Sequence, residues 1–367
     1  MSNFSWQRAV IKVGSALVAP NAKQCSAQYL QAIADFISAS MAQGKEVVLV
    51  SSGSVAAGRM HIKSGQRATI AEKQAMAAVG QAKMLANWAS LVSIDCAQIL
   101  LTVDDLAERK RFVNIKNTLE QLIANKVLPI VNENDTVVVD EIKVGDNDNL
   151  AAHTAIAAQA DCLIICTDVD GLFTENPRSN PHAELIKQVD NIDQSVMDLA
   201  GGAGTAIGTG GMITKLQAAQ KCTHSGIQTL LVNGTKVGSF DALLKGDSPG
   251  TLFLPSASAK SRARQDWLTH TSKVRGQVTI DAGAYHALFH TGASLLAAGI
   301  TQIKGKFKEG DCVEISYQNE VIGKGLVSYS STELSRILGC KSEQIEAVLG
   351  YHAGEAVVHR DNLVLKA

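Results

Sequence analysis

The sequence lacks the features that would place it in a special class of protein. No apolar run approaches the ~20 residues that a membrane-spanning helix requires, and the first ten residues include polar ones where a signal peptide needs an apolar stretch. The net charge of −1 indicates no partner that is held by bulk electrostatics. The seven cysteines are odd in number and include no C-x-x-C pair, so neither a disulfide framework nor a zinc site is indicated. These absences predict a cytoplasmic globular protein.

The order of apolar and amphipathic segments indicates the fold of the N-terminal two thirds of the chain. A chain of 367 residues is long enough for two or three domains of ~150 residues each. Short apolar runs alternate with segments of helical period, which predicts a three-layer αβα sandwich with a mainly parallel sheet. The alternating segments are residues 9–13, 27–43, 47–50, 70–92, 98–101, 112–125, 127–131, 150–160, 163–166, 212–223, 229–232 and 240–244.

The alternation stops after residue 254, where a stretch of small and polar residues follows. Beyond that stretch, short segments punctuated by glycines predict a small β-barrel. We therefore expect a first domain at residues 1–255, a linker at 256–272 and a second domain at 273–367. The expected strands of the second domain are residues 277–280, 294–296, 300–305, 312–317 and 321–327.

Two clusters of short polar side chains follow the apolar run at residues 127–131. They are residues 132–135 (Asn-Glu-Asn-Asp) and residues 146–149 (Asp-Asn-Asp-Asn). Turns favour Asn and Asp, but eight such groups in eighteen positions exceed what turns need. In an open α/β sheet, ligands bind at the carboxyl ends of the strands. The clusters predict a substrate pocket, with an elaborate loop as the alternative.

Two further strand ends carry residues with a chemical use. Lys12 lies in the apolar run at residues 9–13 and precedes Gly14, so it either snorkels from a sheet edge or points into a polar cavity. The run at residues 47–50 is followed by residues 51–54 (Ser-Ser-Gly-Ser) and an expected helix. Exposed N–H groups at a helix start bind anions, and a serine that simply caps the helix is the alternative.

A glycine-rich stretch at residues 201–211 opens the helical segment that carries Lys215. It matches neither G-x-x-x-x-G-K-[ST] nor G-x-G-x-x-G. Consecutive glycines still expose N–H donors, and Lys215 adds a positive charge one turn into the helix. A flexible linker is the alternative. Thr167 and Asp168 follow the apolar run at residues 163–166, where they indicate either a nucleotide contact or a turn.

Together these segments contain the groups that phosphoryl transfer needs. The reaction requires positive charge and N–H donors around the phosphoryl oxygens, and it demands no covalent chemistry from the protein. Lys12 and Lys215 on opposite sides of the bridging phosphate, aligned by Asp148, would meet that need. The side chains of the two polar clusters would hold an acceptor that carries both ammonium and carboxylate groups.

On these motifs, the chain resembles the glutamate 5-kinase family over essentially its full length. Its N-terminal part is similar to the amino acid kinase fold, and its C-terminal part to a PUA domain. The resemblance implies that ATP phosphorylates the γ-carboxylate of L-glutamate to L-glutamyl 5-phosphate, the first step of proline biosynthesis, with Mg²⁺ accompanying the nucleotide. It also implies proline as a feedback inhibitor, a homo-oligomer that is either a dimer or a tetramer, and glutamyl phosphate reductase as a partner for the next step.

The resemblance assigns roles residue by residue. Lys12 and Lys215 correspond to the lysines that flank the transferred phosphoryl group, and Asp148 to the carboxylate that orients them. It assigns no metal ligands, and it does not favour a direct catalytic role for Asp170. The expected glutamate-binding residues are Ser52, Gly53, Asn132, Asp135, Asp146 and Asn147. The expected ATP-binding residues are Lys12, Thr167, Asp168, Thr209, Gly210, Gly211, Met212, Ile213, Thr214 and Lys215.

Two alternatives remain. One keeps the fold and changes the carboxylate acceptor, because acetylglutamate, aspartate, carbamate and uridylate kinases have similar cores; the polar clusters favour an amino acid with a free ammonium. The other is RNA binding through the PUA domain. Residues 273–367 contain ten Lys plus Arg and ten Asp plus Glu, so they lack the basic footprint of a nucleic-acid-binding domain. We expect their aromatic residues to be core: Phe289, Phe307, Tyr317, Tyr329 and Tyr351.

Overall fold

The computed structural model of the protein describes residues 4–21, 24–65, 68–137, 146–177, 179–200, 211–255, 274–351 and 356–365. The chain divides into two compact units, Met1–Ala259 and Lys260–Ala367. The division falls within the linker expected at residues 256–272, which lies outside the described residues, so the three domain limits stay a prediction.

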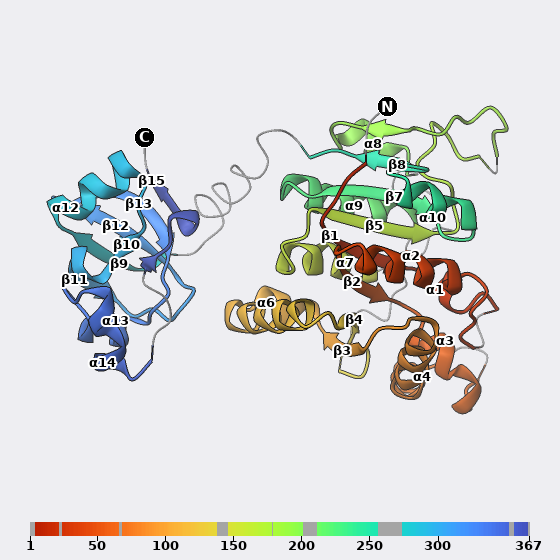
Figure 1. The fold of residues 1–367 in the computed structure, drawn as a ribbon, viewed down its shortest axis with the longest axis horizontal. Helices are drawn as coiled ribbons and strands as arrows, with labels where there is room; N and C mark the ends of the chain where they lie inside the picture. Colours follow the sequence, from red (N-terminus) through yellow and green to blue (C-terminus); the bar gives the residue numbers. More distant parts are fainter. Residues whose placement is uncertain are drawn as a thin grey trace. The chain divides into compact units, whose positions relative to one another are not determined.

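The first unit is built on one eight-stranded sheet. Its strand order is β3-β4-β2-β1-β5-β7-β8-β6, which can be followed from the bottom of Figure 1 upward. All neighbouring strands are parallel except β7 and β8, so the predicted mainly parallel sheet is confirmed. The strands are β1 (Arg8–Val13), β2 (Glu46–Ser51), β3 (Cys96–Leu101), β4 (Leu128–Glu133), β5 (Cys162–Thr167), β6 (Gln188–Val189), β7 (Gln228–Asn233) and β8 (Thr251–Phe253).

Helices connect these strands and pack on both faces of the sheet. The longest of the described helices, α4, begins with a capping box in which the Thr69 side chain and Glu72 satisfy each other's backbone N–H groups. The helices are α1 (Ser15–Val18), α2 (Leu30–Ala42), α3 (Ser54–Gly58), α4 (Ile70–Leu91), α5 (Val103–Ala107), α6 (Arg109–Ala124), α7 (Asp146–Ala157), α8 (Gln194–Asp198), α9 (Met212–His224) and α10 (Val237–Leu244).

Successive residues of the central strands enter two separate hydrophobic cores, one on each face of the sheet. In β1, Val10 packs in the core that contains α6, α7 and α9, whereas Ala9 and Ile11 pack in the core that contains α2, α4 and α10. Because both faces are buried, the strands are continuous apolar runs rather than alternating ones. Each fully buried Ile or Leu contributes about 1.5–3 kcal/mol, so these runs determine which segments occupy the centre of the sheet.

Helices α3 and α4 cross at close range, and this crossing fixes the loop that follows β2. A Cβ on Gly80 would lie 1.8 Å from the carbonyl oxygen of Ser54, and one on Gly58 would lie 1.8 Å from that of Met76. A larger residue at either position would force the two helices apart. Gly53, immediately before α3, has a φ of 106°, a left-handed conformation that favours glycine. These glycines therefore fix the backbone path of the residues that follow β2.

The second unit contains a five-stranded sheet of order β11-β9-β12-β13-β15 and a two-stranded sheet of β10 and β14. This confirms a separate domain of short strands. Three short helices, which the sequence pattern did not predict, pack with the sheets: α12 (Ala282–His286), α13 (Ser331–Arg336) and α14 (Ile345–Leu349). The strands are β9 (Val274–Ile280), β10 (Leu295–Leu296), β11 (Ile300–Gly305), β12 (Cys312–Tyr317), β13 (Glu320–Leu326), β14 (Ala356–Val358) and β15 (Leu363–Leu365).

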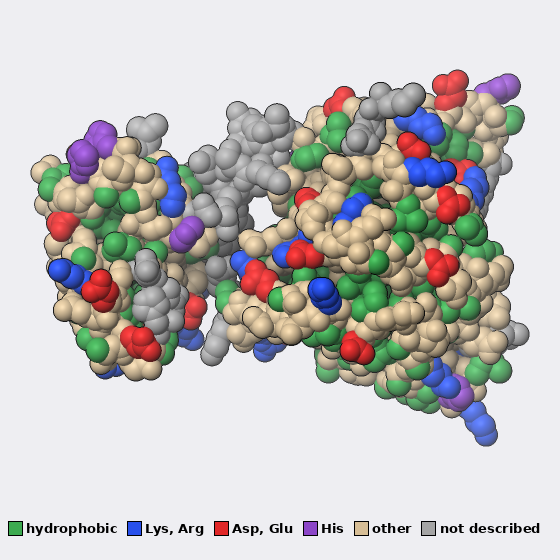
Figure 2. Space-filling model, in the orientation of Figure 1, with side chains coloured by type: hydrophobic (Ala, Val, Ile, Leu, Met, Phe, Trp, Pro, Cys, Tyr) green, Lys and Arg blue, Asp and Glu red, His purple; other side chains and the backbone are tan. Residues whose placement is uncertain are grey.

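We expected the aromatic residues of the second unit to lie in its core, and this expectation is wrong for two of them. Phe307 and Tyr329 are buried, but Phe289 is 36% exposed and Tyr351 is 44% exposed. Tyr351 lies at the surface, where its hydroxyl donates to the Glu333 carboxylate at 2.6 Å. On the face drawn in Figure 2, basic and acidic side chains of this unit are interspersed, so no basic patch accompanies the exposed rings on that face.

Candidate active site

The carboxyl ends of β1, β2, β4 and β5 lie at the same edge of the sheet, because these neighbouring strands are parallel. From β1 the chain continues to β2 on one side of it, and β5 lies on the other side. Ligands bind at such reversals of strand order in open α/β sheets. Most of the predicted site residues follow these strand ends or begin the helices next to them.

The centre of the site is a carboxylate between two ammonium groups. Asp148 lies in the first turn of α7, and its Oδ1 is 2.6 Å from the Nζ of Lys12 at the end of β1. Its Oδ2 is 3.2 Å from the Nζ of Lys215 in the first turn of α9. The Thr214 hydroxyl donates to the same Oδ2 at 2.7 Å. The sequence prediction that positions 12, 148 and 215 converge is thus met by the geometry.

The electrostatics of this group follow from its burial. Asp148 is fully buried and Lys12 is only 5% exposed. Burial acts to raise the pKa of Asp148, but the charges of Lys12 and Lys215 outweigh it and hold that pKa below its ordinary value. Burial also lowers the pKa of Lys215, and Asp148 only partly opposes this. One carboxylate and two ammonium groups leave a net positive charge in a poorly solvated place.

A second polar network joins the ends of β2 and β4 to the start of α7. The amide nitrogen of Asn147 donates to Ser52 Oγ at 2.7 Å and to Asn132 Oδ1 at 3.0 Å. The amide nitrogen of Asn132 donates to Gln81 Oε1 in α4 at 2.7 Å. Among the described residues, the buried Asn147 Oδ1 and Gln81 Nε2 have no hydrogen-bond partner. Buried polar atoms are normally satisfied, so these two atoms point to a ligand that completes the network.

Asp135 lies beside this network, in the loop after β4. Its Oδ2 accepts a hydrogen bond from the Ser54 hydroxyl at 2.7 Å. Burial raises the pKa of Asp135, and the bond from Ser54 opposes that rise. Ser54 therefore contacts a site residue and does not cap α3, whose N-cap position is Gly53 and has no side-chain cap. The capping alternative that we considered for Ser52 and Ser54 is wrong.

The residues expected to bind the nucleotide come from β5 and α9. Thr167 is buried at the end of β5, and its hydroxyl donates to Asp168 Oδ1 at 3.2 Å, while Asp168 is exposed. Gly211 occupies the N-cap position of α9, and Met212 and Ile213 lie in its first turn with Thr214 and Lys215. Thr209, Gly210 and the side chain of Asp146 lie outside the described residues, so their assignment stays a prediction.

Sequence reasoning missed one member of the site. Gln81 lies in the middle of α4, 51 residues before its partner Asn132, and no motif surrounds it. Its only signal is a polar side chain on the buried face of an otherwise apolar helix stripe, where it is 7% exposed.

None of the helices among the described residues is both long and apolar enough to span a membrane. No group of three or more His, Cys, Asp and Glu side chains in the same part of the chain could hold a metal ion.

The geometry and the comparisons with known proteins agree on the class. The model of the amino acid kinase family matches residues 7–233, and that of the PUA domain matches residues 276–349. The chain belongs to the amino acid kinase family and carries a C-terminal PUA domain.

Relatives over the full length place it more narrowly within that family. A glutamate 5-kinase from Salinibacter ruber is 50% identical over 99% of this chain and 98% of its own length. Glutamate 5-kinases from Idiomarina loihiensis and Syntrophotalea carbinolica are 47% and 45% identical, each over 98% of this chain. The aligned regions span 98% and 97% of the lengths of these two relatives, respectively. Within the amino acid kinase family, the chain groups with the glutamate 5-kinases.

Proposed function

We propose that this protein transfers the γ-phosphoryl group of ATP to the γ-carboxylate of L-glutamate, which forms L-glutamyl 5-phosphate in the first step of proline biosynthesis. The observation that carries the proposal is the pair of ammonium groups of Lys12 and Lys215 held by one buried carboxylate. Relatives named glutamate 5-kinase, similar over the full length, support the choice of acceptor.

In the proposed mechanism, Lys12 and Lys215 stabilise the negative charge on the oxygens of the transferring phosphoryl group. Asp148 orients both ammonium groups. It does not act as a base, because its pKa stays below the ordinary value despite its burial, through the charges of the two lysines. The attacking γ-carboxylate of glutamate is itself ionised at neutral pH. Positioning and charge stabilisation are therefore sufficient, and no proton has to be removed from the acceptor.

The amide network is the proposed glutamate pocket. Ser52, Asn132 and Asn147 would hold the substrate, and the unpartnered Asn147 Oδ1 supplies an acceptor for its ammonium group. Asp135 would provide the negative charge that pairs with that ammonium. Gly53, proposed for the same pocket, lies at the end of β2, where a Cβ would lie 2.7 Å from Val18 Cγ1. Asp146 is proposed for this pocket from the sequence alone.

Thr167, Asp168 and the start of α9 are the proposed nucleotide site. The described donor set suits a Mg²⁺ ion that arrives with ATP, because Mg²⁺ usually keeps waters and is held by substrate phosphates with one or two carboxylates. Asp168, exposed after β5, is the carboxylate that would contact it. When bound, the ion would neutralise part of the phosphate charge. Gly210 and Gly211 are proposed to approach the phosphates through their N–H groups, together with Thr209.

The acceptor is tested by measuring ADP release with L-glutamate, N-acetyl-L-glutamate and L-aspartate. We expect turnover with L-glutamate and little with the other two. N-acetylation removes the ammonium that Asp135 and Asn147 would bind, and aspartate is one methylene too short to reach the lysines. Preference for N-acetyl-L-glutamate would assign the site to another kinase of this fold.

The remaining expectations belong to the same proposal. We propose a cytoplasmic enzyme that is inhibited by proline, assembles as a dimer or tetramer, and passes its product to glutamyl phosphate reductase. The RNA-binding alternative is tested with the full-length protein and a structured RNA. We expect no salt-dependent complex, because the second domain has equal numbers of basic and acidic residues.

A further inference from the structure

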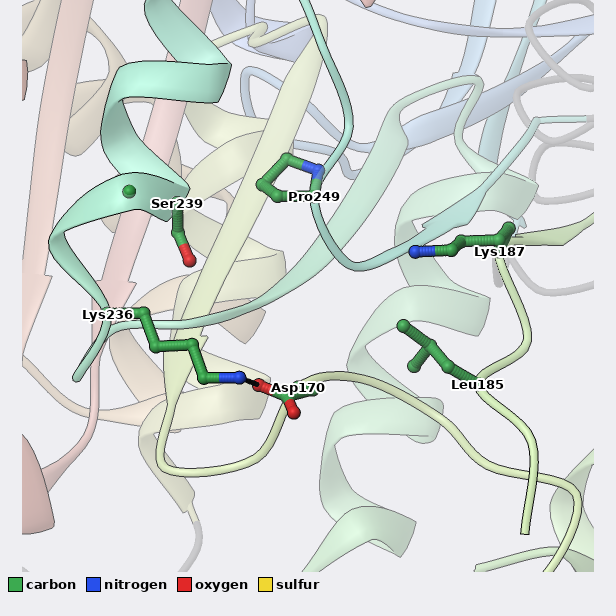
Figure 3. Close-up of a pocket in the computed structure, with 7 residues that line it drawn as sticks. Asp170, Leu185, Lys187, Lys236, Ser239 and Pro249 are labelled. Atoms are coloured by element: carbon green, nitrogen blue, oxygen red, sulfur yellow. Dashed lines mark ion pairs between the residues drawn. The ribbon is translucent and has the colours of Figure 1, made fainter. Parts of the chain in front are cut away.

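A cavity of about 370 Å³ lies apart from the residues proposed above, at the start of α10 (Figure 3). It is open to solvent on one side and bordered by the loop after β5, the segment that leads to β6, the first residues of α10, and the turn before β8. None of its lining residues belongs to the proposed glutamate or nucleotide site. The lining residues are Asp170, Leu185, Lys187, Lys236, Gly238, Ser239 and Pro249.

The walls of this cavity are held in place by contacts behind them. Thr251 Oγ1 accepts from the backbone N–H of Leu172 at 2.8 Å and donates to the carbonyl of Ile186 at 2.6 Å. It therefore ties the loop after β5 to the segment that leads to β6. A Cβ on Gly250 would lie 1.9 Å from the carbonyl oxygen of Leu231, so the turn before β8 packs directly on β7. These contacts fix the walls of the cavity relative to the sheet.

The charges around the cavity are unevenly matched. Lys236 Nζ lies 2.6 Å from Asp170 Oδ1, which also accepts from the Asn233 amide at 2.8 Å. The carboxylate of Asp170 is thus already paired with Lys236. Lys187 has no ion-pair partner among the described residues, and Figure 3 shows its ammonium directed across the cavity. The lining therefore has one positive charge in excess.

A hydroxyl group faces the same space. Ser239 is only 7% exposed, and its Oγ has no hydrogen-bond partner within the described part of the chain. Figure 3 shows this oxygen directed into the cavity from the side opposite Lys187. Lys236, at the N-cap position of α10, makes no side-chain cap. The N–H of Ser239 donates to the Lys236 carbonyl at 3.1 Å, so the N–H groups of Val237 and Gly238 are the ones at the helix start that could meet a ligand. A buried hydroxyl, an ammonium and a helix N-terminus together favour an anion.

We propose that this cavity is a second small-molecule site, which binds a carboxylate or phosphate group between Lys187, Ser239 and the first turn of α10. Asp170 is two residues after Asp168 in the same loop. If the proposed nucleotide site is correct, an occupant of this cavity will also alter ATP affinity through that loop, and this consequence alone rests on the proposed function.

The binding claim is tested by calorimetry on the full-length protein with inorganic phosphate and, separately, malonate. A non-hydrolysable ATP analogue and magnesium are kept saturating, so that the probes do not report on the nucleotide site. The test variant is Gly238→Glu, which places a carboxylate in the cavity; a Cβ at this position meets nothing within 4 Å. Gly65→Glu is the matched control, because a Cβ there also meets nothing within 4 Å.

We expect one probe molecule per chain in the wild type and in Gly65→Glu, and binding weaker by at least about tenfold in Gly238→Glu, since the introduced carboxylate repels the anionic probe and competes with it for the charge-assisted hydrogen bond from Lys187. The tighter of the two probes identifies the group as carboxylate or phosphate. Equal affinity in Gly238→Glu, or no binding of either probe to the wild type at millimolar concentration, would overturn the proposal. Weaker binding of the ATP analogue itself to Gly238→Glu would instead make the cavity part of the nucleotide site. Turnover is not the readout, so a negative result leaves the kinase proposal intact.

Discussion

Replacing Asp148 by Asn removes the charge at the centre of the site and keeps the shape of the side chain. In the wild type, its two oxygens lie 2.6 Å from the Lys12 ammonium and 3.2 Å from the Lys215 ammonium. An amide neutralises neither lysine, and its NH₂ group turns a donor toward one of them. Thr214 also loses its charged acceptor. Two ammonium groups then remain close together in a place where Lys12 is nearly buried.

Two losses follow, and their sizes can be estimated. Leaving a buried charge uncompensated costs roughly 3–5 kcal/mol of folding free energy, which corresponds to a fall in Tm of roughly 6–20 °C for a unit of this size. Loss of a preorganised electrostatic contact costs about 10²–10³ in kcat. The pKa of Lys215, already lowered by burial, loses the group that opposed this shift. The alkaline limb of the rate profile should therefore move to lower pH, because Lys215 acts when protonated.

The assay is steady-state ADP release as a function of pH, together with thermal unfolding of the same preparations. Asp95→Asn is the matched control, since Asp95 is exposed and none of the described side chains bonds to its carboxylate; it should change neither quantity. If Asp148→Asn folds and turns over at the wild-type rate with an unshifted alkaline limb, Asp148 does not orient the two lysines.

Two further predictions concern Asp135 in the proposed glutamate pocket and Gly80 at the crossing of α3 and α4. Burial raises the pKa of Asp135, and a protonated acid does not attract the substrate ammonium, so KM for glutamate should rise as pH falls through that pKa. Asp135→Asn should show a raised KM that no longer changes on the acid side, and a retained pH dependence would remove Asp135 from the pocket. Gly80→Ala places a Cβ 1.8 Å from a backbone carbonyl of α3 and should destabilise the protein by about 1–3 kcal/mol. Gly65→Ala, with open space around it, should not, and chemical denaturation compares the two.

Much of the first domain could be predicted because its local signals agree with its packing. The strands buried on both faces are runs of Val, Ile and Leu, and that composition alone distinguishes them from the amphipathic helices. The antiparallel β8 could not be predicted, because a strand of three residues carries no directional pattern. It pairs with β7 through Leu230 and Leu252.

Part of the candidate site could also be predicted from local features of the sequence. Residue types such as a lysine inside an apolar strand and crowded Asn and Asp side chains are costly unless they bind something, so they mark a site locally. Their pairing is not local. Asn147 meets Ser52 across 95 positions, and Asn132 meets Gln81 across 51. A glutamine within a helix has no unusual neighbour in the sequence, so its role appears only when the strands are assembled.

Lys215→Met separates what the fold needs from what the reaction needs. With Met at this position, Asp148 remains paired with Lys12 at 2.6 Å, and the excess positive charge of the buried group disappears. Burial lowers the pKa of Lys215, so its charged form opposes folding, and wild-type stability should rise with pH as this lysine loses its proton. The variant should lack that rise and be more stable at neutral pH by about 1 kcal/mol. Its kcat should nevertheless fall on the order of 10²-fold or more, with KM for glutamate little changed. Lys83→Met, an exposed position on α4, serves as the control for both measurements. If Lys215→Met is less stable than the wild type and keeps its kcat, the reasoning is wrong. In that case the Lys215 ammonium would stabilise the fold and would not be needed for phosphoryl transfer.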